Sequence, residues 1–143
     1  MTIVYISHPF FFDMDLSLVR EMFASNNSFF YLIDVPNYAR SSTALNLVQN
    51  KKKAGIYPAF EFPEMNEFSD FLDLKRTFMI YRTSKKTYSW SNLFLQISIS
   101  KKIKILKPNI IHCNNFLSFN FIYFLISNKI AKVITVHDPI PHS

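Results

Sequence analysis

The segment PNIIHCNNFLSFNFIYFLISNKIAKVITVHD, residues 108–138, decides the fold class. Short apolar runs at residues 109–113 and 132–136 predict two strands, and Pro108 introduces the first of them. The mostly apolar residues 116–128 between them predict a helix that is covered nearly all round. A strand, a helix and a second strand in this order indicate a parallel α/β sheet.

The start of the chain shows the same order of elements. TIVYIS at residues 2–7 and SFFYLIDV at residues 28–35 predict buried strands. Apolar residues at helical spacing predict a helix over residues 13–24, with Asp13 or Asp15 as its N-cap. Together, the four strands predict an open, doubly wound, mostly parallel Rossmann-like sheet of the α/β class.

The middle of the chain has a less regular pattern. A short helix is predicted near residues 42–51, followed by an extended stretch near residues 56–62. Pro58 and Pro63 bracket that stretch and favour an edge strand or a loop. A long helix is predicted from residue 89 or 91 to residue 106, with lysines that complement the helix dipole in its C-terminal half.

Length and composition limit the possible classes of function. With 143 residues, 49% of them hydrophobic, the chain fits one domain with a single core. Its single glycine excludes the glycine-rich loops of P-loop and dinucleotide-binding proteins. Its single cysteine, Cys113, excludes an internal disulfide and fits a reducing compartment. The most apolar stretch, residues 116–126, is shorter than the roughly 20 residues of a membrane span, so we expect a cytoplasmic protein.

The charge is strongly polarised along the chain. Residues 1–74 contain five Lys and Arg against nine Asp and Glu, whereas residues 75–143 contain eleven Lys and Arg against one acid, Asp138. Such a basic half suggests a surface that meets anions, such as lipid head groups or nucleotide phosphates. A solvated basic face without a partner is an equally good interpretation.

Polar side chains stand where the predicted strands end, which is where ligands bind in open α/β sheets. They are His8 after the first strand, His112, Asn114 and Asn115 at the third, and His137 and Asp138 after the last. Imidazoles and amides at these positions can hold sugar hydroxyls and phosphate oxygens. The alternatives are a His-Pro turn for His8, a core histidine for His112 and turn chemistry for the two asparagines.

Neither a metal site nor a nucleic-acid partner is expected. His112, Cys113, His137 and Asp138 lack the spacing of a zinc site. Cys113 has no identifiable orienting group that would make it a nucleophile. The stretch KRTFMIYRTSKKTYSW, residues 75–90, mixes basic and aromatic residues, but no recognised nucleic-acid-binding module surrounds it.

The end of the chain resembles the second half of the N-terminal domain in GT-B glycosyltransferases of family 4. The resemblance rests on KPNIIH at residues 107–112, the helix predicted after it, and VITVHD at residues 133–138. That family transfers a sugar from a nucleotide donor to an acceptor, in a cleft between two Rossmann-like domains and without a bound metal. The resemblance implies that His137 is catalytic and lies near the reacting sugar.

The same resemblance implies the roles of the remaining polar residues. His8 lies in the loop that faces the donor phosphates, and His112 and Asn114 line the acceptor side. Asn115 and Asp138 are expected to bind substrate beside them. The partners implied are a nucleotide sugar and a glycan or lipid-linked acceptor in envelope or polysaccharide synthesis, with no separate cofactor. The basic half suits work at the anionic inner face of a membrane.

Two features depart from the family pattern. The loop SHPFFFDMD, residues 7–15, lacks the glycines that bring the backbone close to the donor phosphates, and the C-terminal donor-binding domain is absent. We therefore expect residues 1–143 to be a single, incomplete acceptor-side domain, truncated and inactive by itself, because positioning supplies much of such catalysis.

Two further hypotheses belong to other classes of function. In the first, the chain is a non-enzymatic α/β binding module whose basic half is a partner surface. In the second, it is a nucleic-acid-binding domain, which predicts steeply salt-dependent binding. A second Rossmann-like half with paired glutamates downstream would favour the enzyme.

Overall fold

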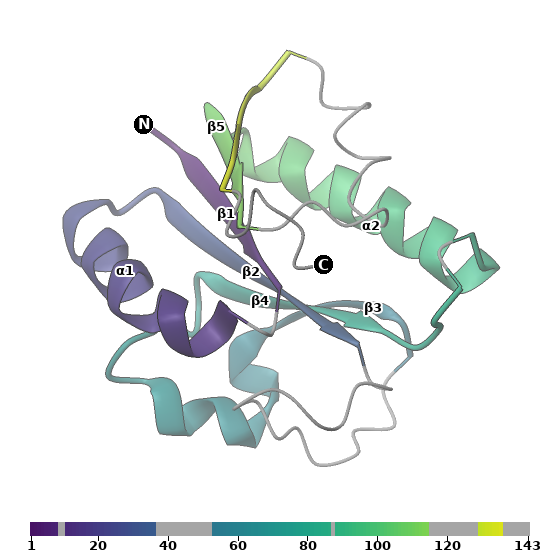
Figure 1. Cartoon of the computed structure of the whole chain (residues 1–143), viewed down its shortest axis with the longest axis horizontal. Coiled ribbons are helices and arrows are strands. Elements are labelled where there is room, and N and C mark those ends of the chain that lie inside the picture. Colours follow the sequence, from purple (N-terminus) through teal and green to yellow (C-terminus); the bar gives the residue numbers. More distant parts are fainter. Residues whose placement is uncertain (9–10, 37–52, 87, 115–128, 136–143) are drawn as a thin grey trace, which may run out of the picture.

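The computed structural model describes residues 1–8, 11–36, 53–86, 88–114 and 129–135, which form a six-stranded sheet with helices (Figure 1). The strands lie in the order β3-β4-β2-β1-β5-β6. Their bounds are Ile3–Ser7 for β1, Phe29–Pro36 for β2, Gly55–Pro58 for β3, Thr77–Arg82 for β4, Ile110–Cys113 for β5 and Ala131–Ile134 for β6; α1 spans Phe12–Ser25 and α2 spans Trp90–Leu106. The expected α/β class with a mostly parallel sheet is confirmed.

Strand β1 lies near the centre of the sheet and pairs in parallel with β2 on one side and β5 on the other. Strands β4 and β6 extend the parallel pairing outward. Among the described strands, β3 alone is antiparallel, and it lies at the edge beside β4. The edge suits Pro58, because proline cannot donate a ladder hydrogen bond. The edge strand is thus the correct one of the two structures predicted near residue 56.

Alternating side chains of the strands build one core on each face of the sheet. Tyr5 of β1 packs on the face where Val19 of α1 is buried, together with the segment that follows β3. Ile6, one position later, packs on the opposite face, where Ile99 of α2 is buried. The two helices therefore cover opposite faces, as the period of two along a strand requires (Figure 1).

The ends of α2 explain why the long predicted helix forms there. Ser89 is its N-cap, and the Ser89 side chain accepts a hydrogen bond from the backbone N–H of Asn92 at 3.3 Å. Lys107 adopts a left-handed conformation, with φ of 48°, and ends the helix. The lysines of the last turns lie at the negative end of the helix dipole.

Helix α1 begins differently from the prediction. Its N-cap position is Phe11, which makes no side-chain capping hydrogen bond. Asp13 and Asp15 both lie inside the first turn, so the prediction that one of them caps the helix is wrong. A carboxylate in the first turn still interacts favourably with the positive end of the helix dipole.

Strand β4 is an element that the sequence patterns do not predict. All six of its residues are buried, and it pairs in parallel with β2. The run TFMIY, residues 77–81, has the composition of a buried strand, but it lies within the basic and aromatic stretch of residues 75–90, for which no strand is predicted. Arg82 can be buried at the end of this strand because Asp34 of β2 neutralises its charge.

Two predicted helices, near residues 42–51 and over residues 116–128, lie outside the described residues. The end of the last predicted strand, at residue 136, lies outside them as well. None of the helices in the described parts of the chain is long and apolar enough to cross a bilayer.

Candidate functional site

Buried polar side chains gather at the carboxyl edge of the sheet, on both of its faces. Ser7 ends β1, Arg82 ends β4, and Asn114 directly follows β5; all three are buried. Asp15 reaches this edge from the first turn of α1, and Asp34 reaches it from β2. Since these groups cannot be solvated by bulk water, each requires a partner within the protein.

The first cluster is centred on the carboxylate of Asp15. The Tyr5 hydroxyl donates to Asp15 Oδ1 at 2.8 Å, and the Ser7 hydroxyl donates to Oδ2 at 2.6 Å. The Asn114 amide also donates to Oδ2, from Nδ2 at 2.6 Å. Hydrogen bonds to an ionised carboxylate are short and strong, and they offset the cost of burying its charge.

Asn114 joins this cluster to the loop that follows β1. Its Oδ1 accepts a hydrogen bond from the backbone N–H of His8 at 3.0 Å. Its own backbone N–H donates to the carbonyl of Ile6 at 3.2 Å. One asparagine side chain thus fixes the start of the loop and the carboxylate beneath it. The phenol of Tyr5 stays protonated, because burial and then the neighbouring Asp15 raise its pKa.

The second cluster is a two-point ion pair on the α2 face of the sheet. Arg82 Nε lies 2.6 Å from Asp34 Oδ1, and a second guanidinium nitrogen lies 2.9 Å from Oδ2. Burial raises the pKa of the Asp34 carboxyl, and the positive charge of Arg82 opposes that rise. The pair joins the carboxyl ends of β2 and β4, where it leaves neither charge uncompensated.

His8 lies between the two clusters and is half-buried. Burial, and secondarily the positive charge of Arg82, lowers the pKa of His8 to about 4. Its imidazole is therefore neutral at pH 7, and it can both donate and accept a hydrogen bond. Such a group suits a sugar hydroxyl or a protonated phosphate oxygen better than a permanent anion.

His112 lies elsewhere, within β5 on the α1 face of the sheet. Its Nε2 is 2.8 Å from the hydroxyl oxygen of Thr135, and its ring contacts the ring of Tyr5 at 4.8 Å between centroids. Burial lowers the pKa of His112. It lines an apolar groove of about 230 Å³ together with Leu18, Met22 and Val133. Its side chain is thus only partly buried, with one ring nitrogen beside Thr135 and the ring against the groove.

The structure therefore joins the backbone of His8 to the side chain of Asn114, and it places His112 beside the Asp15 cluster, where its ring contacts that of Tyr5. Asn115, His137 and Asp138 lie outside the described residues. Four further residues, Ser7, Asp15, Asp34 and Arg82, have no place among those predicted. The signal for Asp34 is visible in LIDV, where one acid interrupts an apolar strand, whereas Asp15 follows the ordinary pattern of a helix start.

No group of three or more His, Cys, Asp or Glu side chains within the described ranges could hold a metal ion. No family model, curated protein or solved structure matches this chain.

Proposed function

We propose that residues 1–143 form the acceptor-side, Rossmann-like domain of a glycosyltransferase that uses a nucleotide-sugar donor. The observation that carries the proposal is the contact between His8 and Asn114 at the carboxyl edge of the parallel sheet. Ligands of open α/β sheets bind at this edge. Helices on opposite faces of the sheet support the doubly wound arrangement.

The chemistry of the edge supports sugar binding. The neutral imidazole of His8 can bind a hydroxyl or a phosphate oxygen in either hydrogen-bonding sense. Asp15 accepts hydrogen bonds from three protein groups, so we assign it to positioning rather than to ligand contact. The assignment of His137 as the catalytic residue is carried by the motif resemblance at residues 133–138.

The proposal is tested by binding rather than by activity, because in such an enzyme the sugar passes from donor to acceptor in the cleft between this domain and a second one. In the proposal, His8 of this domain faces the phosphates of the donor. The ¹⁵N-labelled chain is titrated with UDP, UDP-glucose and GDP-mannose at millimolar concentrations while amide shifts are recorded. We expect one of them to shift the amides of His8 and Asn114, and His8→Gln to weaken that response several-fold. Asn109→Ala, at the amino end of β5, is the matched control and should leave the response unchanged.

Two results would contradict the proposal. One is the absence of any nucleotide-dependent shift at the carboxyl edge. The other is a response that is the same in the wild type and in His8→Gln, since His8 would then not contact the ligand.

A second candidate function is a non-enzymatic binding module with a basic partner surface. It is favoured by a separate observation, the exposed basic and apolar face of α2. That face is separate from the polar side chains at the carboxyl edge of the sheet.

A further inference from the structure

Helix α2 presents large apolar side chains on two opposite sides. Its inner side is buried in the core through Leu95, Ile99 and Ile103. On its outer side, Trp90 is 78% exposed, Phe94 65%, Ile97 51% and Ile105 73%. Their spacing of three, four and eight residues places all four on one stripe of the helix. Packing within the described parts of the protein explains the inner side and leaves the outer side unexplained.

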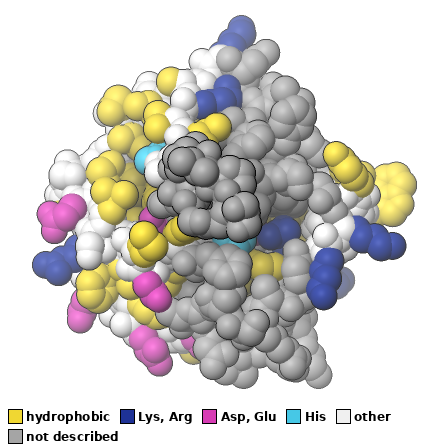
Figure 2. Space-filling model, viewed as in Figure 1, with side chains coloured by type: hydrophobic (Ala, Val, Ile, Leu, Met, Phe, Trp, Pro, Cys, Tyr) yellow, Lys and Arg dark blue, Asp and Glu magenta, His cyan; other side chains and the backbone are white. Residues whose placement is uncertain are grey.

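The charge on this outer stripe has one sign. Lys101 and Lys104 are exposed at positions that share its side of the helix, and Lys85 and Lys86 precede the helix. Residues 75–135 contain no Asp or Glu at all. In Figure 2, the acidic side chains lie at the left, over α1 and below it, whereas the right side, over the start of α2, shows basic and hydrophobic side chains and no acidic ones among the described residues. Further hydrophobic side chains lie at the left, among the acidic ones.

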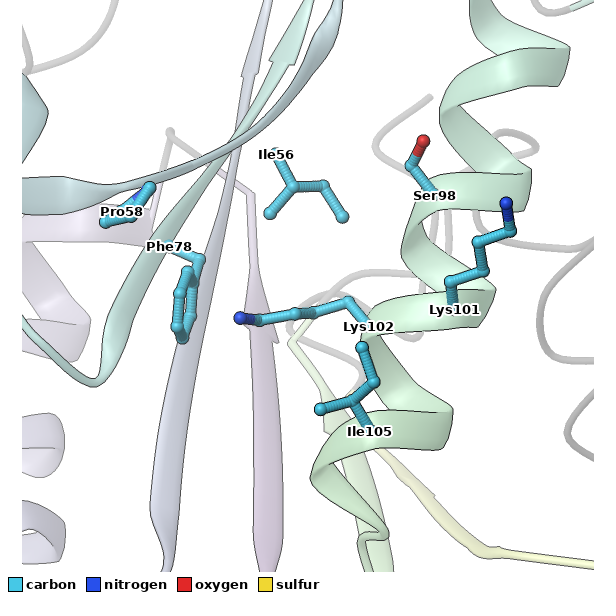
Figure 3. A pocket seen from close by; sticks show the side chains of 7 residues that line it. All are labelled: Ile56, Pro58, Phe78, Ser98, Lys101, Lys102 and Ile105. Carbon is cyan, nitrogen blue, oxygen red and sulfur yellow. The ribbon is translucent and has the colours of Figure 1, made fainter.

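Lys101 and Lys102 are adjacent in the chain but differ in orientation. Lys102 Nζ lies 3.6 Å from the ring centroid of Phe78, over a groove of about 290 Å³ between α2 and strands β3 and β4. Figure 3 shows Lys102 reaching into this groove toward Phe78, while the ammonium group of Lys101 points away from it. Lys102 therefore holds α2 against the sheet. Lys101 also lines the groove, but it is exposed and its ammonium group belongs to the outward surface.

We propose that the outer stripe of α2 docks the protein on an anionic lipid bilayer; the stripe consists of Trp90, Phe94, Ile97, Ile105, Lys101 and Lys104. Tryptophan and phenylalanine are the side chains that enter the region between head groups and acyl chains. Each lysine near an anionic surface adds about fivefold to the partition coefficient. The inner side of α2 stays in the core, so docking requires no unfolding.

The composition of the stripe favours a bilayer over the other anionic partners. Nucleic-acid surfaces use aromatic rings as stacking platforms in basic grooves, which aliphatic side chains such as Ile97 and Ile105 do not provide. A convex helix with aromatic and aliphatic residues among lysines is the pattern of interfacial helices. Docking through this stripe does not require that a sugar binds at the carboxyl edge of the sheet.

The experiment uses Trp90, the only tryptophan of the chain, as its probe. The protein is mixed with vesicles of phosphatidylcholine alone or with one-third phosphatidylglycerol, and both sedimentation and Trp90 emission are measured. We expect binding and a blue shift of the emission with the anionic vesicles only. High salt should weaken the binding.

Two double variants and two matched controls locate the surface. Lys101→Glu with Lys104→Glu should lower the partition coefficient at least tenfold, and Phe94→Ser with Ile97→Ser should abolish the blue shift. Lys53→Glu with Lys75→Glu makes the same charge change elsewhere, and Met14→Ser removes an apolar side chain that is 68% exposed on α1. Both controls should bind like the wild type, and circular dichroism checks that every variant is folded.

The proposal is overturned by equal binding to neutral and anionic vesicles, or by undiminished binding of the Lys101/Lys104 variant. Tight binding to RNA or to an acidic protein without any vesicle binding would also overturn it, and would assign the stripe to that partner. Failure here leaves the nucleotide titration at His8 unaffected, so the two proposals fail separately.

Discussion

Asn114 Nδ2 lies 2.6 Å from Asp15 Oδ2, although 99 positions separate the two residues along the chain. This contact ties the end of β5 to the first turn of α1 across the end of β1. The carboxylate is buried, and its neighbours donate every hydrogen bond described for it. The geometry of the Asp15 cluster therefore depends on a few uncharged donors around one charge.

Asn114→Ala should destabilise the protein by about 2–3 kcal/mol, because it removes a charge-assisted hydrogen bond and leaves a buried carboxylate short of one donor. Urea unfolding followed by circular dichroism measures this loss. Asn109→Ala is the matched control, since Asn109 is exposed and accepts one hydrogen bond, from the backbone N–H of Thr2. We expect that control to cost about 0.5–1 kcal/mol. Equal losses would show that the Asp15 cluster contributes nothing beyond a surface contact.

Apolar runs predict β1 and β2, although β2 contains the buried Asp34, whereas β4 is not predicted. TIVYIS and SFFYLIDV predict β1 and β2 within a residue or two, and the serine at position 89 marks the start of α2. β4 is missed because its apolar run TFMIY lies among the basic residues Lys75, Arg76 and Arg82, and Arg82 is buried only through its pairing with Asp34. That pairing depends on the register between β2 and β4, which no local pattern encodes.

Contacts between elements, which no local pattern encodes, also limit prediction of the site. His8 and Asn114 follow strands, so the rule that ligands bind beyond carboxyl ends is enough to select them. Asp15 lies within a helix and reaches the site through three-dimensional contact with Ser7 and Asn114. Its role becomes visible only when the faces of the sheet are known.

Arg82→Met should destabilise the protein by about 3–5 kcal/mol, because it leaves the Asp34 carboxylate buried without its counter-charge. The double variant Asp34→Leu with Arg82→Met should cost less than Arg82→Met alone, since no charge then remains buried. Thermal unfolding of the wild type, the two single variants and the double variant gives the comparison. Additive losses from Asp34→Leu and Arg82→Met would contradict a coupled pair.

Lys102→Ala should destabilise the protein by about 1 kcal/mol or more, because it removes both the packed stem and the ammonium over Phe78. Lys102→Met keeps an apolar stem of similar length, so it should reduce the stability by less than about 1 kcal/mol. Burial lowers the pKa of Lys102, which means that the charged form is partly desolvated and that its removal costs little. Lys101→Ala, whose side chain points away from the groove, should change the stability by less than about 0.5 kcal/mol. Equal effects at positions 101 and 102 would refute the distinction between the inward and the outward lysine.

His8 should make the protein less stable in mild acid. Its pKa is lowered from 6.5 to about 4 on folding, so below pH 6.5 the unfolded chain binds a proton that the folded protein does not bind. The stability that this site contributes is therefore complete above pH 6.5 and falls as the pH drops from 6.5 toward 4. In His8→Gln, unfolding by urea should show a smaller loss of stability over this window than in the wild type. NMR titration of the His8 ring measures its pKa directly. A midpoint at or above pH 6.5 would contradict the effect of burial on His8. It would also contradict the neutral imidazole that the proposed sugar binding requires.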